Sequence, residues 1–292
     1  GARAYTKFIN MLENYDGEIN TVADLECVDG LSKGKIFDKC IDVLTGKVEV
    51  DDTQDETLCF FDELMSITEI GKAKASSIMK LGINDMETLE KEKHNVLNDK
   101  QLIGLKYHKY DSLRIPRDEI DKHNVFIKGV VDTLKNTDYQ IVGSYRRGKM
   151  ESGDIDILIC NHDSHSSVFT EFVEKLKHSG YLLSDDLAYG NRKYMGYSSF
   201  CGIPRRIDIL YCTPDEYPFS ILYFTGSGDY NKGMRAWCLK QKYTLNEHGL
   251  YHFVDKRKQG RVHHTFRKEI DIYNYMGIPY VEPEKRVKFH LK

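Results

Sequence analysis

Hydrophobic residues recur at helical spacing over roughly the first third of this 292-residue chain, and further along they alternate with polar residues. In the first part, apolar residues such as Phe8, Ile9 and Leu12 lie close together on one helical stripe, which is typical of helices that bury one face. From residue 118 onward, helical stretches alternate with strand-like ones. The elements predicted there are a helix to about 135, strands at 139–142 and 154–158, a helix at 168–176, and strands near 194 and at 205–211.

The order of these elements predicts four units. An acidic linker that begins at Asp51 separates the first two units. Pro116 separates the second unit from the third, because proline disfavours helix at the residue before it. The predicted fold class is α+β: two helical units, a unit with a sheet and helices on one face of it, and a small mixed C-terminal subdomain with a helix at 231–240. The predicted boundaries are 1–52, 53–117, 118–227 and 228–292.

Two stretches of the third unit alternate acids with isoleucines. In the first, Asp154 and Asp156 flank Ile155, and both carboxylates emerge on one face because alternate side chains of a strand point to opposite faces. Asp208 lies in the second stretch in the same way. Alone it reads as a surface acid, but on a neighbouring strand it would complete a group of three carboxylates. Such a group suits two hard divalent cations, Mg²⁺ in particular, roughly 3.5 to 4 Å apart.

Two stretches of the helical units combine a glycine-bearing turn with lysines at a helix start. The first runs from Val28 to Ile36 and the second from Leu64 to Ala75. Each has the character of a helix-hairpin-helix, in which the backbone amides of the turn approach a phosphate. For the first stretch alone an ordinary helical turn is an equal alternative. Two such hairpins in one chain predict binding to a nucleic-acid backbone without regard to sequence.

The net charge of −3 does not by itself indicate a nucleic-acid-binding protein, because such proteins usually show a basic domain or patch. Metal-binding acids lower this number, however, while basic clusters remain around Arg146 and between Lys256 and Lys268. A solvated surface is the alternative interpretation of either cluster.

The seven cysteines are scattered without the spacing of a zinc site, so they predict reduced, mostly buried thiols rather than a disulfide framework. Neither a signal peptide nor an apolar run of about eighteen residues is found. The sequence therefore predicts a soluble, intracellular protein without a membrane partner. Residence in the nucleus, in the cytoplasm or at a viral replication site is left open.

Taken in order, these motifs resemble the family X DNA polymerases over nearly the whole chain. A lone pair of spaced acids after Gly-Ser also occurs in poly(A) polymerases, CCA-adding enzymes and antibiotic nucleotidyltransferases, but those lack the hairpins and the Tyr-Phe-Thr-Gly-Ser turn. The matching segments are the two hairpins, Ile103 to Tyr107, Arg114 to Arg117, Gly143 to Leu158, Arg205 to Asp208, Tyr223 to Ser227, and Asn231 to Arg235.

The resemblance implies a fold and an activity. The fold would comprise a lyase-like domain, a second DNA-binding helical subdomain, a nucleotidyltransferase-type palm and a C-terminal subdomain that binds the nascent base pair. The activity would be template-directed DNA synthesis from deoxynucleoside triphosphates, filling short gaps in base-excision-type repair. The partner would be gapped or nicked double-stranded DNA, bound by a monomer.

The resemblance also implies roles for particular residues. Asp154 and Asp156 would bind both Mg²⁺ ions, with Mn²⁺ as a substitute, and Asp208 would bind the catalytic one, with Arg206 supporting the carboxylates. Na⁺ or K⁺ would bind at the hairpin turns. The residues implied to hold the nucleotide or the nascent base pair are Arg114, Ser144, Arg147, Gly153, Tyr223, Phe224, Gly226, Asn231 and Arg235. The residues implied to contact DNA are Tyr5, Gly30, Lys35, Gly71, Lys72, Ala73 and Lys232.

In the first unit, Lys39 aligns with the family's Schiff-base lysine and would attack a 5′-deoxyribose phosphate. A lysine must lose its proton to attack, so burial or nearby positive charge must lower its pKa. The alternative is a surface lysine. Residues 1–52 hold six Lys and Arg against eleven Asp and Glu, a balance of −5 that is unusual for a domain that binds a 5′-phosphate. The sequence also starts inside the family's pattern, which predicts either a trimmed chain or a first domain that is shortened in this lineage, and Glu69 replaces a common glycine of the second hairpin.

Two alternative functions remain open. One is a template-independent terminal transferase, but such family members carry a longer loop where this chain has the short segment Ser198 to Pro204. The other is a non-catalytic gap-binding module, against which the presence of all three acids argues. The sequence favours template-directed synthesis over both.

Overall fold

The protein is described by a computed structural model that covers residues 8–9, 11–12, 15, 17–28, 31, 34–47, 52–255 and 257–290. For residues 52–57 only the backbone is described. The predicted DNA contacts Tyr5 and Gly30 fall outside the described residues.

The first helical unit contains α2 (Val22–Glu26) and α3 (Lys35–Leu44). The apolar face of α3 buries Phe37, which packs with Phe8 and Leu25 in a small hydrophobic core. The helical pattern predicted for this part of the chain is therefore confirmed.

The second helical unit forms one core from four helices. These are α4 (Asp52–Ser66), α5 (Lys72–Lys80), α6 (Met86–Val96) and α7 (Asp99–Asp111). The Asp85 carboxylate caps α6 by accepting a hydrogen bond from the Thr88 amide at 2.7 Å, which explains why the helix begins at Met86. The glycine-bearing turn of the second hairpin joins α4 to α5.

Helix α7 attaches this unit to the one that follows. Tyr107 stacks on Tyr197 with ring centroids 4.1 Å apart, and the Tyr107 hydroxyl donates to the Asp185 carboxylate at 2.6 Å. On its other side, α7 passes so close to the hairpin turn that a Cβ added to Gly104 would lie 2.2 Å from the Thr68 carbonyl oxygen. Because a side chain does not fit there, Gly104 allows α7 to connect the hairpin with the sheet.

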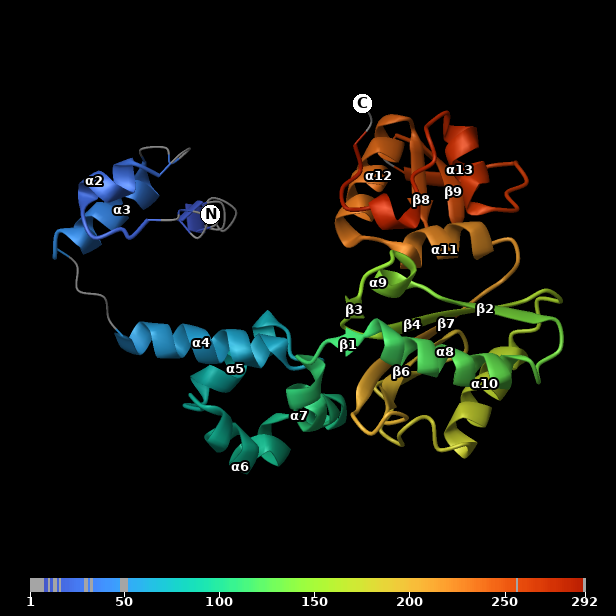
Figure 1. The fold of residues 1–292 in the computed structure, drawn as a ribbon, viewed down its shortest axis with the longest axis horizontal. Coiled ribbons are helices and arrows are strands. Elements are labelled where there is room, and N and C mark those ends of the chain that lie inside the picture. Colours follow the sequence, from blue (N-terminus) through green and yellow to red (C-terminus); the bar gives the residue numbers. More distant parts are fainter. Residues whose placement is uncertain are drawn as a thin grey trace.

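The third unit is built on a five-stranded sheet (Figure 1). The strands of this unit are β1 (Ile115–Pro116), β2 (Thr137–Ile141), β3 (Glu151–Ser152), β4 (Ile155–Asn161), β5 (Ala188–Tyr189), β6 (Lys193–Ser198) and β7 (Arg205–Cys212). The sheet has the order β2-β4-β7-β6-β5, and only its β4–β7 pair is parallel. Strands β1 and β3 form a separate antiparallel pair.

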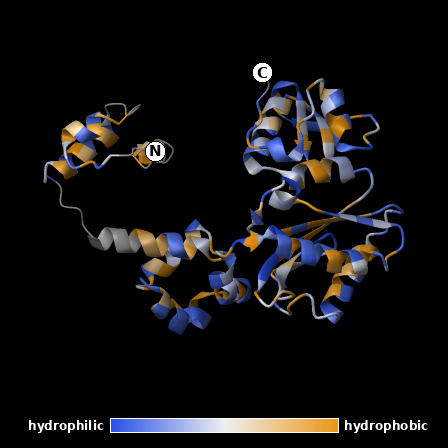
Figure 2. Ribbon diagram, in the orientation of Figure 1, coloured by the Kyte–Doolittle hydropathy of each residue, from blue (hydrophilic) through white to orange (hydrophobic). Residues whose placement is uncertain are grey.

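Helices cover both faces of this sheet. On one face α8 (Arg117–Val131) and α10 (Ser167–His178) pack on the isoleucines of β4 and β7, and Figure 2 shows these central strands largely in the colour of hydrophobic residues. On the other face Ile221 of α11 (Tyr217–Thr225) packs against Leu158. The prediction of helices on one face alone is therefore incomplete. Helix α11 is apolar nearly all round, so it has no helical periodicity to detect.

The fourth unit packs against α11 from the other side. Phe219 and Leu222 of α11 join its core together with Tyr230. Its elements are α12 (Gly228–Lys240), β8 (Tyr243–Asn246), β9 (Gly249–Val254), β10 (Arg257–Arg261), α13 (Glu269–Met276) and the short 3-10 helix η1 (Pro283–Lys285). Within the described ranges, no helix combines the length and the apolar character needed to cross a membrane.

Candidate active site

Two parallel strands bring the three predicted acids together. Asp156 of β4 lies in register with Asp208 of β7, and Asp154 immediately precedes β4. One carboxylate oxygen of each residue lies within 4.8 Å of the others. The register pair Ile155 and Ile207 points into the core, so the alternation predicted from the sequence places the acids on the face that α11 covers. A group of this kind offers the oxygen ligands that hard divalent cations bind.

Two of the three carboxylates share one arginine. Arg206 donates to Asp154 at 3.2 Å and to the two oxygens of Asp208 at 3.4 and 3.3 Å, so the residue expected to support the carboxylates touches two of them. Burial and the charges of Asp154 and Asp208 raise the pKa of Asp156 to about 8, although Arg206 and Arg147 oppose the rise. Burial also raises the pKa of Asp208, despite Arg206. Without a cation the three carboxylates therefore hold a proton at neutral pH, because buried negative charges that lie close together repel one another.

This proton predicts that divalent-cation binding depends on pH. Asp156 must lose its proton to bind a cation, so the apparent affinity for the cation should rise by up to about tenfold per pH unit below pH 8 and level off above it.

The same proton affects stability. In the cation-free protein, the folded chain keeps a proton on Asp156 that the unfolded chain releases above the ordinary pKa of 3.8. The free energy of unfolding should therefore fall as the pH rises between about 4 and 8. Calorimetric cation titrations and thermal unfolding measure the two trends, and Asp156→Asn should weaken both. An affinity that is constant over this range would contradict the prediction.

The short helix α9 (Gly143–Arg146) follows β2 and borders the acids. Gly143 has a φ of +58°, and a Cβ added there would lie 2.2 Å from Asp156 Oδ2. Arg147 follows α9 and donates to the Thr225 carbonyl at the end of α11, at 2.6 Å. The segment predicted to hold the triphosphate thus adjoins both the carboxylates and α11.

The other predicted triphosphate contacts gather around β3. The Ser144 hydroxyl donates to Ser152 Oγ at 2.7 Å. Arg114 pairs with the Glu151 carboxylate at 3.1 Å. A Cβ added to Gly153 would lie 3.0 Å from Arg114 Nη1, so that arginine lies against the backbone just before the acids. The structure therefore brings Arg114, Ser144 and Gly153 to one side of the carboxylate group.

The residues predicted for the sugar and the nascent base pair meet where α11 ends and α12 begins. The Asn231 side chain donates to the Tyr223 carbonyl at 2.7 Å, and the Tyr223 and Phe224 rings meet edge to face. Tyr223, Asn231 and Arg235 line one small pocket. Gly226 lies beside Arg147, which connects this group to the triphosphate segment.

The second hairpin exposes its predicted DNA contacts. Gly71, Lys72 and Ala73 are all exposed, and no side chain caps the first turn of α5, which leaves its backbone amides open to an anion. Glu69, in the turn before, has a φ of +68°, a conformation in which glycine is favoured. Lys232, on α12, is also exposed.

Lys35 and Lys39 lie one turn apart on α3, and both are exposed. Lys39 is therefore not buried. Burial, the first of the two conditions stated for a Schiff-base lysine, is not met. The role of Lys39 stays a prediction.

A buried ionic network between the third and fourth units was not predicted. The Glu269 carboxylate accepts from Arg286 at 2.5 Å and from Arg146 at 3.0 Å, and Arg146 also donates to the Thr225 hydroxyl at 2.6 Å. Although burial opposes it, the two arginines hold the pKa of Glu269 below its usual range. In the sequence Arg146 was visible only as part of a basic cluster, because its partner is 123 residues away.

Comparison with known proteins agrees with this architecture. A family model described as DNA polymerase beta palm matches residues 114–214, and one described as DNA polymerase beta thumb matches residues 220–287. The chain belongs to the family X DNA polymerases. Its palm match contains the three acids and its thumb match contains Asn231 and Arg235, so the site of this family X chain spans both matched regions.

Curated relatives align over most of this family X chain. It is 28% identical to DNA polymerase lambda of Arabidopsis thaliana over 97% of its own length and 57% of that protein, and 27% identical to DNA polymerase lambda of Rattus norvegicus over 98% and 52%. It is 23% identical to DNA nucleotidylexotransferase of Xenopus laevis over 77% of the chain and 52% of that protein. The chain thus spans roughly half the length of these relatives. Family X polymerases generally use divalent metal ions, and Asp154, Asp156 and Asp208 are the candidate group to bind them here.

Proposed function

We propose that this chain is a template-directed DNA polymerase that fills short gaps in DNA during base-excision-type repair. The main support is the meeting of three carboxylates on β4 and β7 with the segment from Gly143 to Arg147. Acids that would bind cations, donors that would bind phosphates and the residues predicted to contact the nascent base pair lie next to one another. The relatives named DNA polymerase lambda support the same reaction class.

Asp154, Asp156 and Asp208 suit two Mg²⁺ ions, and Mn²⁺ offers the same preference for oxygen ligands. The raised pKa of Asp156 fits this assignment, because a bound cation would supply the missing positive charge. When bound, such ions lower the pKa of an attacking hydroxyl and stabilise charge on the transferred and departing phosphates. Arg206 would keep Asp154 and Asp208 oriented toward the ions, because it already donates to both.

Arg147 would bind the nucleotide's outer phosphates, because a guanidinium holds phosphate oxygens bidentately. Its present contact is the Thr225 carbonyl, so a nucleotide would compete with that oxygen for the same donor. Asn231 holds the Tyr223 carbonyl at 2.7 Å, which fixes the segment expected to lie against the incoming sugar. Selection of the nucleotide would come from template pairing.

A one-nucleotide gap in a duplex tests the proposed function. With each deoxynucleoside triphosphate supplied alone and with Mg²⁺, only the one complementary to the template base should be added, and a single strand should not be extended. Extension of the single strand would favour the terminal transferase. Binding of gapped DNA without extension would favour the non-catalytic module.

Replacing Lys72 tests DNA binding independently of catalysis. Replacing Lys72 with alanine should weaken binding to gapped DNA for every sequence and reduce the slope of log affinity against log salt by about 0.9, the effect of one phosphate contact. Lys80→Ala is a matched control, because Lys80 is also exposed but lies at the other end of α5. Fluorescence anisotropy at several salt concentrations measures the slope. Equal slopes for the two variants would remove the hairpin from the DNA interface.

Lys39 tests the proposed lyase activity. A gap with a 5′-deoxyribose phosphate, treated with borohydride, should give a covalent adduct with the wild-type chain and none with Lys39→Ala. Lys47→Ala is the control, because Lys47 is an exposed lysine just beyond α3. An adduct that survives in Lys39→Ala would assign the Schiff base to another amine, and no adduct with the wild type would leave this unit with DNA binding alone.

A further inference from the structure

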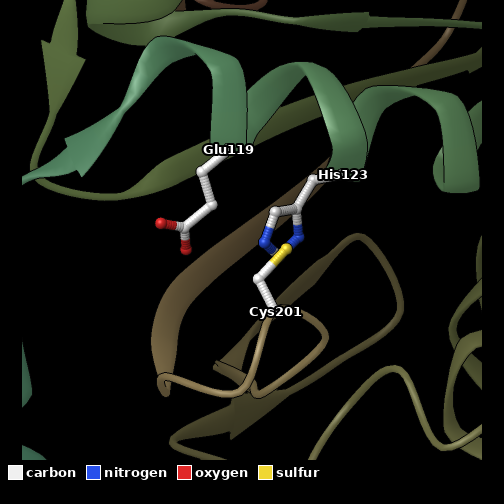
Figure 3. Close-up of side chains that lie close together, drawn as sticks. All are labelled: Glu119, His123 and Cys201. Carbon is white, nitrogen blue, oxygen red and sulfur yellow. The ribbon is translucent and has the colours of Figure 1, made fainter.

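A second cluster of metal-binding residue types lies away from the three acids. Glu119 and His123 are one turn apart on α8, and Cys201 belongs to the connection between β6 and β7. One potential ligand atom of each residue lies within 4.8 Å of the other two. Figure 3 shows the three side chains close together, with His123 and Cys201 pointing toward each other and the Glu119 carboxylate beside them. Because α8 covers the sheet face opposite to α11, the cluster is separate from the carboxylates on β4 and β7.

The imidazole ring of His123 is fully buried, but only one of its two nitrogens has a hydrogen-bond partner. Its Nδ1 lies 2.6 Å from the Tyr181 hydroxyl, whereas its Nε2 has no hydrogen-bond partner. The rings of Tyr181 and Phe200 meet the imidazole edge-on, with centroids 5.5 and 5.3 Å away. If Nδ1 donates to Tyr181, Nε2 keeps a lone pair directed into the cluster. A buried polar atom without a partner is costly, and a metal ion would remove that cost.

Cys201 and Glu119 add a sulfur and an oxygen ligand to the imidazole nitrogen of His123. The prediction that the cysteines are mostly buried is wrong for Cys201, whose thiol is exposed, so an ion can reach it from solvent. Both oxygens of Glu119 accept from the buried Arg205, at 2.7 and 2.8 Å, but each carboxylate oxygen has a further lone pair. Arg205 and Lys122 place positive charge close to the thiol, which disfavours any cation held by charge alone. Only an ion that forms strong bonds to sulfur and nitrogen would bind well here.

We propose that Glu119, His123 and Cys201 form a binding site for a divalent cation of the zinc type. Such ions bind thiolate, imidazole and carboxylate at about 2.0 to 2.3 Å, which places the ligand atoms roughly 3 to 4 Å apart. The three ligand atoms lie within 4.8 Å of one another, so binding an ion requires them to close by about 1 Å, and the exposed Cys201 side chain has room to move. Three protein ligands leave a fourth position for water.

The site would hold the β6–β7 connection against α8. This connection ends where β7 begins, and β7 carries Arg206 and Asp208. A bound ion would therefore fix the start of the strand that supplies one of the three acids, acting by position and not by contact with a substrate.

Cobalt(II), which takes the place of zinc and absorbs visible light, tests the proposal on the full chain. We expect the reduced wild-type protein with Co²⁺ to show a thiolate-to-cobalt charge-transfer band and the strong visible bands of a four-coordinate ion. Both should be lost in Cys201→Ser and kept in Cys59→Ser, which changes an exposed cysteine of α4. The three acids do not interfere, because oxygen ligands give no thiolate band. No band in the wild type, or a band that persists in Cys201→Ser, would overturn the proposal.

Alkylation of the unaltered protein provides a second measurement that needs no variant to fold. A metal-bound thiolate is a poor nucleophile, so Zn²⁺ should slow the reaction of Cys201 with iodoacetamide by about tenfold while Cys59 reacts at its usual rate. Mass spectrometry of the peptides reads each cysteine separately, and Mg²⁺ at the same concentration should protect neither. If Zn²⁺ left the alkylation rate of Cys201 unchanged, the proposed site would be wrong, and His123 would only pack in the core beside Tyr181.

Discussion

Replacing Asp208 with alanine should lower the extension of a gapped primer by about 10³-fold or more, equal to about 4 kcal/mol of transition-state stabilisation. The carboxylate lies in register with Asp156, so its removal takes one ligand away from the candidate cation site. It also leaves Arg206 without its contacts at 3.3 and 3.4 Å, which frees that arginine to turn toward Asp154. Single-turnover extension with Mg²⁺ measures the loss.

Asp138→Ala is the matched control for this experiment. Asp138 lies on β2 of the same sheet, but its side chain is 71% exposed and contacts His162. Its removal should change extension by less than about twofold, because exposed ion pairs contribute little. If Asp208→Ala extended the primer as fast as Asp138→Ala, Asp208 would have no part in the reaction.

Alanine in place of Gly143 should disable the same site without removing a carboxylate. The added Cβ would lie 2.2 Å from Asp156 Oδ2, and the φ of +58° costs a non-glycine residue about 1 to 2 kcal/mol. Either Asp156 or α9 must then move. A displacement of about 1 Å in a reacting group is enough to lower a rate about 10²-fold. Extension assays and thermal unfolding should therefore both show a loss.

Gly129→Ala separates this effect from a general response to added methyl groups. Gly129 is exposed on α8, and a Cβ there meets no atom within 4 Å. Alanine should raise stability by up to about 1 kcal/mol through its helix propensity and leave extension unchanged. Wild-type rates in Gly143→Ala would mean that Asp156 need not occupy its present position.

Local patterns in the sequence were enough to predict the elements that carry the acids. The alternation around Ile155 requires Asp154 and Asp156 to share a face, and Pro116 starts α8 at the next residue, as expected. The glycine-bearing turn before Lys72 likewise starts α5 where it was predicted. Each of these predictions depends on residues only a few positions apart.

The features that the sequence did not predict either depend on contacts between distant residues or lie in a helix without a hydrophobic period. Nothing near Arg146 in the sequence indicates Glu269, because the pair forms only when the third and fourth units pack together. Helix α11 is buried between the sheet and the C-terminal core, so it has no polar face to reveal its period. The orphaned nitrogen of His123 follows from aromatic residues of other elements, which sequence spacing does not reveal.

The parallel pairing of β4 with β7 also determines where this chain can change in length. The two strands are separated by 43 residues in sequence, yet their pairing alone sets the distance between Asp156 and Asp208. Residues added in the surface turn before α10 would leave both carboxylates in place. One residue added between Arg205 and Asp208 would turn the Asp208 carboxylate toward the isoleucines of the opposite face, since side chains alternate along a strand. A short insertion in β7 is therefore far more damaging than a long one in the turn, which makes that turn the suitable position for an inserted peptide tag.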